Sequence, residues 1–276
     1  MKPKWAFNSA SVMHLAWEEE LRLLRKHKWR AVELWFDKMK ACMEKGRTCA
    51  DLGAEMRDAG LDPIGMAPAV VWTESERHDS HHEHLELSER LDVTAALGAQ
   101  ALSVVVLGRR GHDLAREYDR LVEKLRNVAL MAAQRGIRIN LEFIGGYPVN
   151  GTMGTCIELI QRADQSNLGM LLDMCNYYTS ASHVEELERL PSGRLFMVHV
   201  NDALSRPMEE LGNDHRCWPG EGRIDVALLM TEIAKRARYK GFWSMDLYDK
   251  DVWEMDPAEV FRKTAASLKK LQKQLA

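Results

Sequence analysis

Four short apolar runs in the second half of the chain each end on a side chain that can bind a metal ion. The end residues are Glu142, Asp173, His199 and Asp246, which close the runs 139–142, 170–173, 196–199 and 242–246. Each run reads as a buried strand. A parallel β/α barrel gathers the carboxyl ends of its strands on one face, so side chains far apart in sequence converge there. One such residue alone would be read as a strand-end charge facing solvent, but four in consecutive units predict a shared centre.

The whole chain repeats this pattern of a short β-rich run followed by an amphipathic stretch. Segment 113–134, for example, carries Leu114, Leu121, Leu125, Val128 and Met131 at helical spacing. Strands are expected at 5–8, 31–35, 63–68, 101–107, 137–143, 168–173, 195–199 and 242–247. Eight alternating units predict an α/β fold, a single (β/α)8 TIM barrel that fills residues 1–276 as one domain.

Glycines and the missing nucleotide-binding motifs favour a closed barrel over an open sheet. Glycine stands at or just before six of the expected strands, where it can take the left-handed conformation that ends a helix, at Gly60, Gly98, Gly136, Gly169, Gly193 and Gly241. No G-x-G-x-x-G follows the first strand and no Walker-type loop occurs. The usual reasons for a doubly wound sheet are therefore absent.

Composition narrows the partners and the compartment. The net charge of -3 offers no general attraction to a polyanion, so nucleic acid is not expected as a partner. The five scattered cysteines form no C-x-x-C pair, which suits reduced thiols. No signal-peptide core or membrane-length apolar run occurs. We expect a cytoplasmic protein that does not contact a membrane.

Three carboxylates and one imidazole form a mixed, mostly hard set of metal ligands. Such a set suits one divalent ion, Mn²⁺, Co²⁺ or Mg²⁺, with Zn²⁺ also compatible.

The sequence around these ligands resembles the xylose isomerase-like TIM barrel superfamily of sugar isomerases and epimerases, over essentially the whole chain. The segments that carry the resemblance are Leu141-Glu142-Phe143, Leu172-Asp173-x-x-Asn176, 198–202 and 214–225. Within the superfamily it is most similar to the inosose (2-keto-myo-inositol) isomerases, through Phe7-Asn8, Val32-Glu33-Leu34 and Arg216-x-Trp218-Pro219-Gly220. The resemblance implies a divalent ion held by Glu142, Asp173, His199 and the acid at position 246. It also implies a small sugar or cyclitol substrate, and barrels of this kind often form homo-oligomers.

Two residues depart from the family pattern. The last ligand is usually Glu, whereas Asp246 is one methylene shorter. The family often has His where this chain has Asn176, an amide that can donate and accept hydrogen bonds but cannot move a proton by titrating.

This set of groups suits proton transfer next to a carbonyl. A divalent ion chelated by an α-hydroxy ketone acidifies the intervening C–H and stabilises the enediolate that forms. A carboxylate removes the proton and returns it. Glu142 and Asp246 are assigned to this acid and base work as well as to the metal, while Asp173 and His199 anchor the ion. The alternative, in which both acids are only ligands, stays open.

Further residues are candidates for substrate binding. Arg216 can orient a substrate oxygen, although a surface ion pair with Asp214 is the alternative. Glu221 can hold Arg216 or a hydroxyl, or be a plain turn residue. Asn176, Trp218 and Trp72 complete the set, the two indoles as pocket walls, with ordinary core packing as the alternative for each.

Several cationic residues and histidines are weaker candidates for the site. Lys38, Arg109 and Arg110 follow strands two and four and could contact an anionic substrate, but are more simply read as exposed. His78 and His82 have the i, i+4 spacing of helical metal ligands, yet are more simply read as a solvated helix entrance.

Three other functions compete with an isomerase or epimerase of α-hydroxy ketones. A metal-dependent lyase, of the inosose or dehydroshikimate dehydratase type, shares the first proton abstraction and then expels water. An endonuclease IV-like phosphodiesterase needs extra histidines that the ends of strands three and four do not supply. A non-catalytic sugar-binding barrel is the third, motivated by Asp246 and Asn176.

Overall fold

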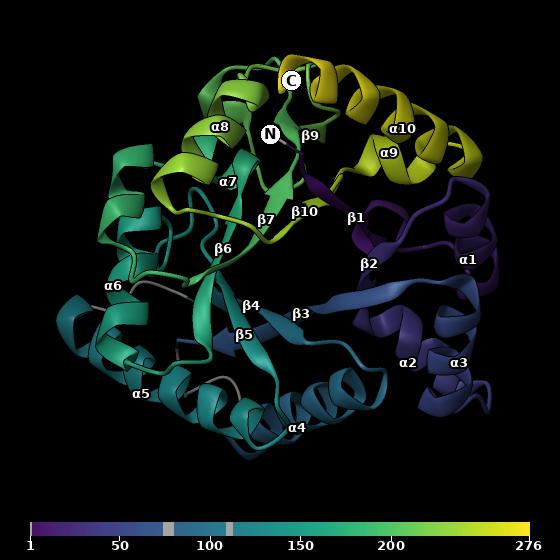
Figure 1. Cartoon of the computed structure of the whole chain (residues 1–276). Helices are drawn as coiled ribbons and strands as arrows, with labels where there is room; N and C mark the ends of the chain where they lie inside the picture. Colours follow the sequence, from purple (N-terminus) through teal and green to yellow (C-terminus); the bar gives the residue numbers. More distant parts are fainter. Residues whose placement is uncertain (1, 74–79, 109–112) are drawn as a thin grey trace.

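The computed structural model describes residues 2–73, 80–108 and 113–276 and contains a closed parallel barrel (Figure 1). Around the barrel the strand order is β1-β10-β7-β6-β5-β4-β3-β2. The barrel strands are β1 (Lys4–Asn8), β2 (Ala31–Trp35), β3 (Asp62–Trp72), β4 (Ala101–Leu107), β5 (Arg138–Glu142), β6 (Leu168–Asp173), β7 (Leu195–Val200) and β10 (Phe242–Met245). The predicted TIM barrel is confirmed.

Helices connect successive strands and surround the barrel (Figure 1). They are α1 (Trp17–Lys26), α2 (Phe36–Glu44), α3 (Cys49–Ala59), α4 (Ser80–Ala96), α5 (Leu114–Ala133), α6 (Met153–Ala163), α7 (Met174–Tyr178), α8 (Val226–Arg236), α9 (Lys250–Glu254) and α10 (Pro257–Gln274). The helix expected over 113–134 is α5, whose N-cap Asp113 accepts a hydrogen bond from the amide of Arg116. In the described part of the chain, no helix has the length and apolar character needed to cross a membrane.

Strand β3 extends further than the sequence suggested. It was expected to end at Pro68, but it runs to Trp72, with a register shift against β4 between Met66 and Ala69. Because proline has no amide hydrogen to donate, the shift lets the strand pass Pro68 and pair again from Ala69 onward.

The glycines act in two different ways. Gly60, Gly98 and Gly136 have φ between 63° and 78°, as expected for residues that end a helix. Gly193 also has a positive φ, 76°, but it lies in the turn before β7 and does not end a helix. That expectation is wrong for Gly169 and Gly241, which do not have positive φ. A Cβ atom on Gly169 would lie 2.5 Å from the carbonyl oxygen of Arg194, so close packing requires glycine there.

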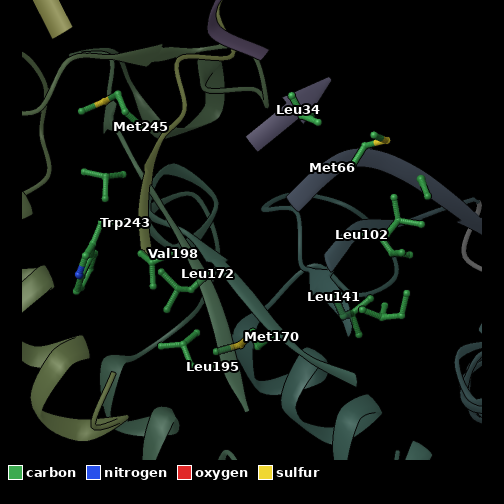
Figure 2. Packing of buried hydrophobic residues seen from close by; sticks show 14 of the residues in the cluster. Leu34, Met66, Leu102, Leu141, Met170, Leu172, Leu195, Val198, Trp243 and Met245 are labelled. Carbon is green, nitrogen blue, oxygen red and sulfur yellow. The ribbon is translucent and has the colours of Figure 1, made fainter. Parts of the chain in front are cut away.

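Alternation along the strands produces two different faces. One set of alternate residues packs between barrel and helices, and Figure 2 shows its members Leu172, Val198, Trp243 and Met245 among the labelled side chains. The other set points into the barrel, where a small apolar layer is formed by Ala6, Ala31, Ile64, Leu171 and Met197.

The ligand positions follow from this alternation. Asp173 lies two residues beyond Leu171, and His199 two residues beyond Met197, so both point to the barrel interior at its carboxyl end. The apolar layer therefore forms the floor beneath the predicted centre.

A buried ion pair fixes the region after β1 and β2. Lys38 on α2 is only 6% exposed and pairs with the fully buried Glu20 of α1. Its ammonium also donates to the carbonyl of Val12 at 2.9 Å, while the Ser9 hydroxyl donates to Glu20 at 2.6 Å. Both interpretations of Lys38, as a substrate contact or an exposed cation, are wrong, because Glu20 compensates its charge inside the protein.

We predict that Lys38→Met lowers the free energy of unfolding by about 3–5 kcal/mol, because Glu20 is left as a buried, uncompensated charge. Adding Glu20→Gln should recover part of this loss. Lys40→Met is the matched control on the same helix, where a 42% exposed side chain pairs with Glu89, and it should change stability by no more than about 0.5 kcal/mol. Urea denaturation measures all three, and equal midpoints for the two single variants would contradict the assignment.

Candidate active site

Three of the predicted ligands form a compact group at the carboxyl end of the barrel. One ligand atom each from Glu142, Asp173 and His199 lies within 4.8 Å of the others. Asp173 and His199 are register partners on neighbouring strands β6 and β7. Parallel pairing therefore brings together residues that are 26 positions apart in the sequence.

Asp246 lies at the edge of this group rather than inside it. Its Oδ2 is 3.4 Å from Nδ1 of His199, yet Asp246 is not part of the compact set. The register gives the reason, because Ser244 is the partner of His199 and Asp246 lies two residues further out. A side chain shorter than Glu does not make up this offset.

The buried carboxylate of Glu33 holds the ring of His199 in one orientation. Its Nε2 lies 2.9 Å from Oε2 of the fully buried Glu33. Its Nδ1 faces Asp246 at 3.4 Å and Asp173 at 3.8 Å, and it is buried with no hydrogen-bond partner among the described residues. When Nε2 donates its hydrogen to Glu33, the lone pair of Nδ1 is directed at the carboxylates of Asp173 and Asp246.

Glu33 is an essential part of the site that sequence reasoning did not assign. Besides His199 it accepts hydrogen bonds from the side chains of Asn8, Ser103 and Ser244, at 3.1, 2.9 and 2.9 Å. The signal was present, since Glu33 is an ionisable residue in the middle of the buried strand β2 and buried charges require partners.

Asn201 and Asn176 orient the carboxylates of the group. The side-chain amide of Asn201, also missed, donates to Asp173 Oδ2 at 2.6 Å and to the carbonyl of Asp246 at 3.1 Å. Asn176 donates to Glu142 Oε1 at 2.9 Å. The Asn176 amide group therefore holds a carboxylate in position, rather than lining the cavity itself.

Arg216 reaches the same cluster from a separate two-stranded sheet. Strands β8 (Asp202–Ala203) and β9 (Arg216–Cys217) pair antiparallel, with Ala203 opposite Arg216. The guanidinium is 2% exposed, and its Nε lies 3.3 Å from Asp173 and 3.6 Å from Asp246. The alternative pairing with Asp214 is not seen, because Asp214 pairs with Lys250.

The pKa values reflect a surplus of buried negative charge. Loss of hydration, with repulsion from Asp173 and Asp246, raises the pKa of Glu142 to about 8 against the opposing charges of His199 and Arg216. Burial alone would lower the pKa of His199, but Glu33 and Asp246 raise it above its ordinary value. Burial alone would raise the pKa of Glu33. The charge of His199 and the hydrogen bonds that Glu33 accepts from His199, Ser103 and Ser244 lower it instead.

A cavity of about 230 Å³ opens above this cluster. Its polar lining includes Asn8, Glu142, His199, Arg216 and Asp246. Trp35, Tyr147 and Tyr248 supply aromatic rings to the wall. The cavity therefore joins the predicted ligands to a space large enough for a small molecule.

Three predicted substrate contacts lie elsewhere in the structure. Trp218 is 4% exposed, donates to the hydroxyl of Thr264 on α10 at 3.0 Å, and packs in the core. The half-exposed Glu221 faces Lys263 at 3.7 Å. Neither these two nor Trp72 lines the cavity as the described residues form it. The loop that carries Trp218 and Glu221 folds around Asp202, which accepts hydrogen bonds from the amides of residues 220, 222 and 224.

The weaker candidates on two other loops fall outside the described residues. These are His78, Arg109 and Arg110; the side chain of His82 is likewise not described.

The residues present fit a divalent cation. Besides His199 Nδ1, the buried Oδ1 of Asp246 lacks a hydrogen-bond partner among the described residues. Three carboxylates and an imidazole nitrogen, with Asp246 at the edge of the compact group, are a suitable donor set. Glu142, Asp173 and His199 would hold the ion, with Asp246 completing the set.

We predict that Glu33→Gln weakens Zn²⁺ binding about 10–100-fold, because the carboxylate that orients and polarises His199 is lost. Competition with a chromophoric chelator measures the affinity. Glu44→Gln, an exposed site on α2, is the control and should leave it unchanged. Unaltered affinity in a folded Glu33→Gln protein would show that Glu33 does not support the ligand.

Comparison with known proteins agrees with this fold and resemblance. An inosose isomerase of Bacillus velezensis is 23% identical over 265 residues, covering 94% of this chain and 93% of that protein. A 3-dehydroshikimate dehydratase of Pseudomonas aeruginosa is 31% identical over 207 residues, covering 74% of this chain but 31% of that protein. A crystal structure of the IOLI protein with a bound zinc atom superposes with a TM-score of 0.89 at 20% identity, covering 99% of both chains.

The family model for xylose isomerase-like TIM barrels matches residues 21–271. With nearly the whole barrel inside that match, the resemblance found in the sequence is confirmed and the chain belongs to the xylose isomerase-like TIM barrel family.

Proposed function

We propose that this protein is a divalent-metal-dependent isomerase or epimerase that moves a proton next to the carbonyl of an inosose, ketose or related α-hydroxy ketone. The observation that carries the proposal is the convergence of Glu142, Asp173 and His199 within 4.8 Å at one end of a small cavity. The names of relatives, inosose isomerase among them, support the same class of enzyme.

The bound cation would draw electron density from the carbonyl and hydroxyl oxygens of the substrate and so acidify the C–H bond between them. Asp173 has no cavity-facing surface and is held by Asn201, Arg216 and the amide of Asn176. His199 is fixed by Glu33. These two residues suit anchoring rather than proton transfer.

Glu142 is the best candidate for the base. It lines the cavity, and Asn176 holds one of its carboxylate oxygens. Its pKa is raised toward neutrality by loss of hydration, which favours a group that can both take and return a proton. Once a cation binds, its charge would keep more of Glu142 ionised.

Asp246 can serve the other side of the substrate. It follows β10, and β7 and β6 separate that strand from the strand of Glu142, so the two carboxylates enter the cavity from different directions. Arg216 also lines the cavity, with its Nε 3.6 Å from Asp246 Oδ2, and it can donate hydrogen bonds to a substrate oxygen. Removal of a proton by one acid and return by the other would invert a carbon centre.

A dehydratase is the second candidate, because one relative bears the name 3-dehydroshikimate dehydratase. It would use the same proton abstraction and then expel a hydroxyl group as water. The two reactions differ in their products, since an epimer or isomer keeps the mass of the substrate while dehydration removes water and creates an enone chromophore.

We predict that the Zn²⁺- or Mn²⁺-loaded protein exchanges a substrate C–H with deuterium in D₂O when given a panel of inososes and ketoses, as NMR can follow. Chelation should abolish exchange. Glu142→Gln should slow it about 10²–10⁴-fold, the usual contribution of a positioned acid or base, and His199→Ala should lose metal and activity together.

Metal content, measured in the same samples, separates the roles of Glu142. Loss of exchange with one ion per chain retained identifies it as the base, whereas loss of both identifies it as a residue required to hold the ion. Glu44→Gln is the control that should keep wild-type rates. Full turnover by His199→Ala would contradict the proposed function, and metal-bound protein that exchanges no substrate would favour the non-catalytic reading.

A further inference from the structure

We propose that the amino-terminal end of the barrel carries a second binding site, for a small organic phosphate with a flat ring, such as a nucleoside monophosphate. The site lies away from the metal ligands, and it does not rest on the proposed function. The inference comes from a cavity at that end whose lining combines cationic side chains with aromatic rings.

This second cavity has a volume of about 630 Å³ and opens where the barrel strands begin. The starts of β1, β2, β3 and β10 line it, through Lys4, Ala31, Asp62 and Phe242. The link 27–30 between α1 and β2 and one face of α10, residues 265, 268, 269 and 272, complete the lining. Cavities of this volume hold small organic ligands.

The second cavity is separate from the active site. Ala31 at the start of β2 lines the second cavity, whereas Trp35 at the end of the same strand lines the active-site cavity. Four residue steps of about 3.3 Å place them about 13 Å apart along the strand. Within the described part of the chain, the two cavities share no lining residue. A molecule bound in one therefore leaves the other free.

Positive charge predominates in the lining. Asp62 is its one carboxylate among the described residues, and its cationic side chains are Lys4, Lys28, Arg30 and Lys269. None of the four makes an ion pair or a side-chain hydrogen bond within residues 2–73, 80–108 and 113–276. The two internal gaps in these ranges follow the carboxyl ends of β3 and β4, whereas this cavity lies at the amino ends. Because the whole chain has a net charge of -3, these cations are a local concentration of positive charge.

The link between α1 and β2 is held by its backbone. The amide of Trp29 donates to the carbonyl of Leu24 at 3.0 Å, and the carbonyl of Arg30 accepts from the amide of Asp62 at 2.8 Å. The consecutive residues Lys28, Trp29 and Arg30 are therefore fixed beside the cavity without the use of their side chains. The two charged groups remain available to a ligand.

Two indole groups of the lining have unused hydrogen-bond donors. Trp29 is 8% exposed and Trp5 is partly buried. The Nε1 atom of each is buried and has no hydrogen-bond partner among the residues that the structure describes. An indole N–H can only donate, and buried polar groups in proteins nearly always have a partner. The oxygen atoms of a ligand would supply acceptors that these parts of the protein do not.

Together, these groups select the chemistry of the ligand. Lysine and arginine bind phosphate through charge-assisted hydrogen bonds. The aromatic residues Trp5, Trp29 and Phe242 offer contacts to a flat ring. Asp62 would repel a phosphate group alone, but it can accept a hydrogen bond from a hydroxyl or amino group. A nucleoside monophosphate carries all three kinds of group, so AMP is the probe.

Calorimetric titration of the metal-free protein at low ionic strength tests the proposal, with AMP, adenosine and inorganic phosphate as ligands. Removal of metal prevents AMP from binding to a cation in the active site. We expect one saturable AMP site per chain, with AMP bound about tenfold or more tighter than adenosine or phosphate. Added salt should weaken AMP binding, because it screens exposed charges. Absence of AMP binding at millimolar concentration, or equal binding of adenosine or phosphate, overturns the proposal.

Paired charge variants test the lining directly. Arg30→Gln combined with Lys269→Gln removes one charge from each of two sides of the cavity and should weaken AMP binding about tenfold or more. Lys45→Gln combined with Lys235→Gln removes the same charge from exposed positions outside the lining, and this control should keep the wild-type affinity. Equal affinities of the two double variants, both folded by circular dichroism, would show non-specific attraction and contradict the site.

The position of bound AMP distinguishes this site from the active site. In ¹⁵N-labelled protein, AMP should shift the indole N–H signals of Trp5 and Trp29 and leave that of Trp35 in place, with each signal assigned through its Trp→Phe variant. A shift confined to Trp35 would place AMP at the active site and overturn the proposal. None of these measurements requires turnover, so their outcome is independent of the proposed function.

Discussion

The arrangement of side chains at the carboxyl end of the barrel depends on one constraint. Carboxylates that are buried there need positive charge close to them. Glu33, Asp173 and Asp246 are at most 4% exposed, and Glu142 joins them at the barrel end, where loss of hydration raises its pKa to about 8. Only His199 and Arg216 face them with positive charge among the described residues. Charges buried in this way are tolerated when cations and hydrogen bonds compensate them. Binding of a divalent ion would supply that compensation and would couple the stability of the barrel end to its chemistry.

The barrel interior is layered to support this cluster. Alternation along each strand places an apolar floor at Leu171 and Met197 and the ligands Asp173 and His199 two residues further on. Between them, the polar contacts of Glu33 with Ser103, Ser244 and His199 span four strands. Rotation of the imidazole is therefore restricted from below, as a metal ligand requires. The rigid strands carry the ligands, and the short β8–β9 sheet adds Arg216 from the side.

The sequence contained the fold and most of the cluster of candidate ligands but few of the supporting contacts. Strand and helix periodicity was enough for the barrel, because each unit is a local pattern, and strand-end position was enough for Glu142, Asp173 and His199. The contact of His199 with Glu33 joins residues 166 positions apart across the barrel, which no local pattern reveals. Trp218 and Glu221 lie close in sequence to Arg216, yet the hydrogen bonds of Asp202 turn their loop toward α10 and away from the cavity. Lys38 lies next to Asp37 in sequence, and only the packing of α1 against α2 shows that its partner is Glu20.

The central claim is that one cation is bound by side chains from the last four barrel strands. A crystal structure of the protein grown with Mn²⁺ or Zn²⁺, with anomalous diffraction collected at the absorption edge of the metal, tests it most directly. The account predicts a single peak per chain, within about 2.0–2.3 Å of Glu142, Asp173 and His199 Nδ1. Asp246 should either bind the ion as a fourth ligand or lie next to the bound ion. A peak at another place, or none beside these side chains at saturating metal, would contradict the account.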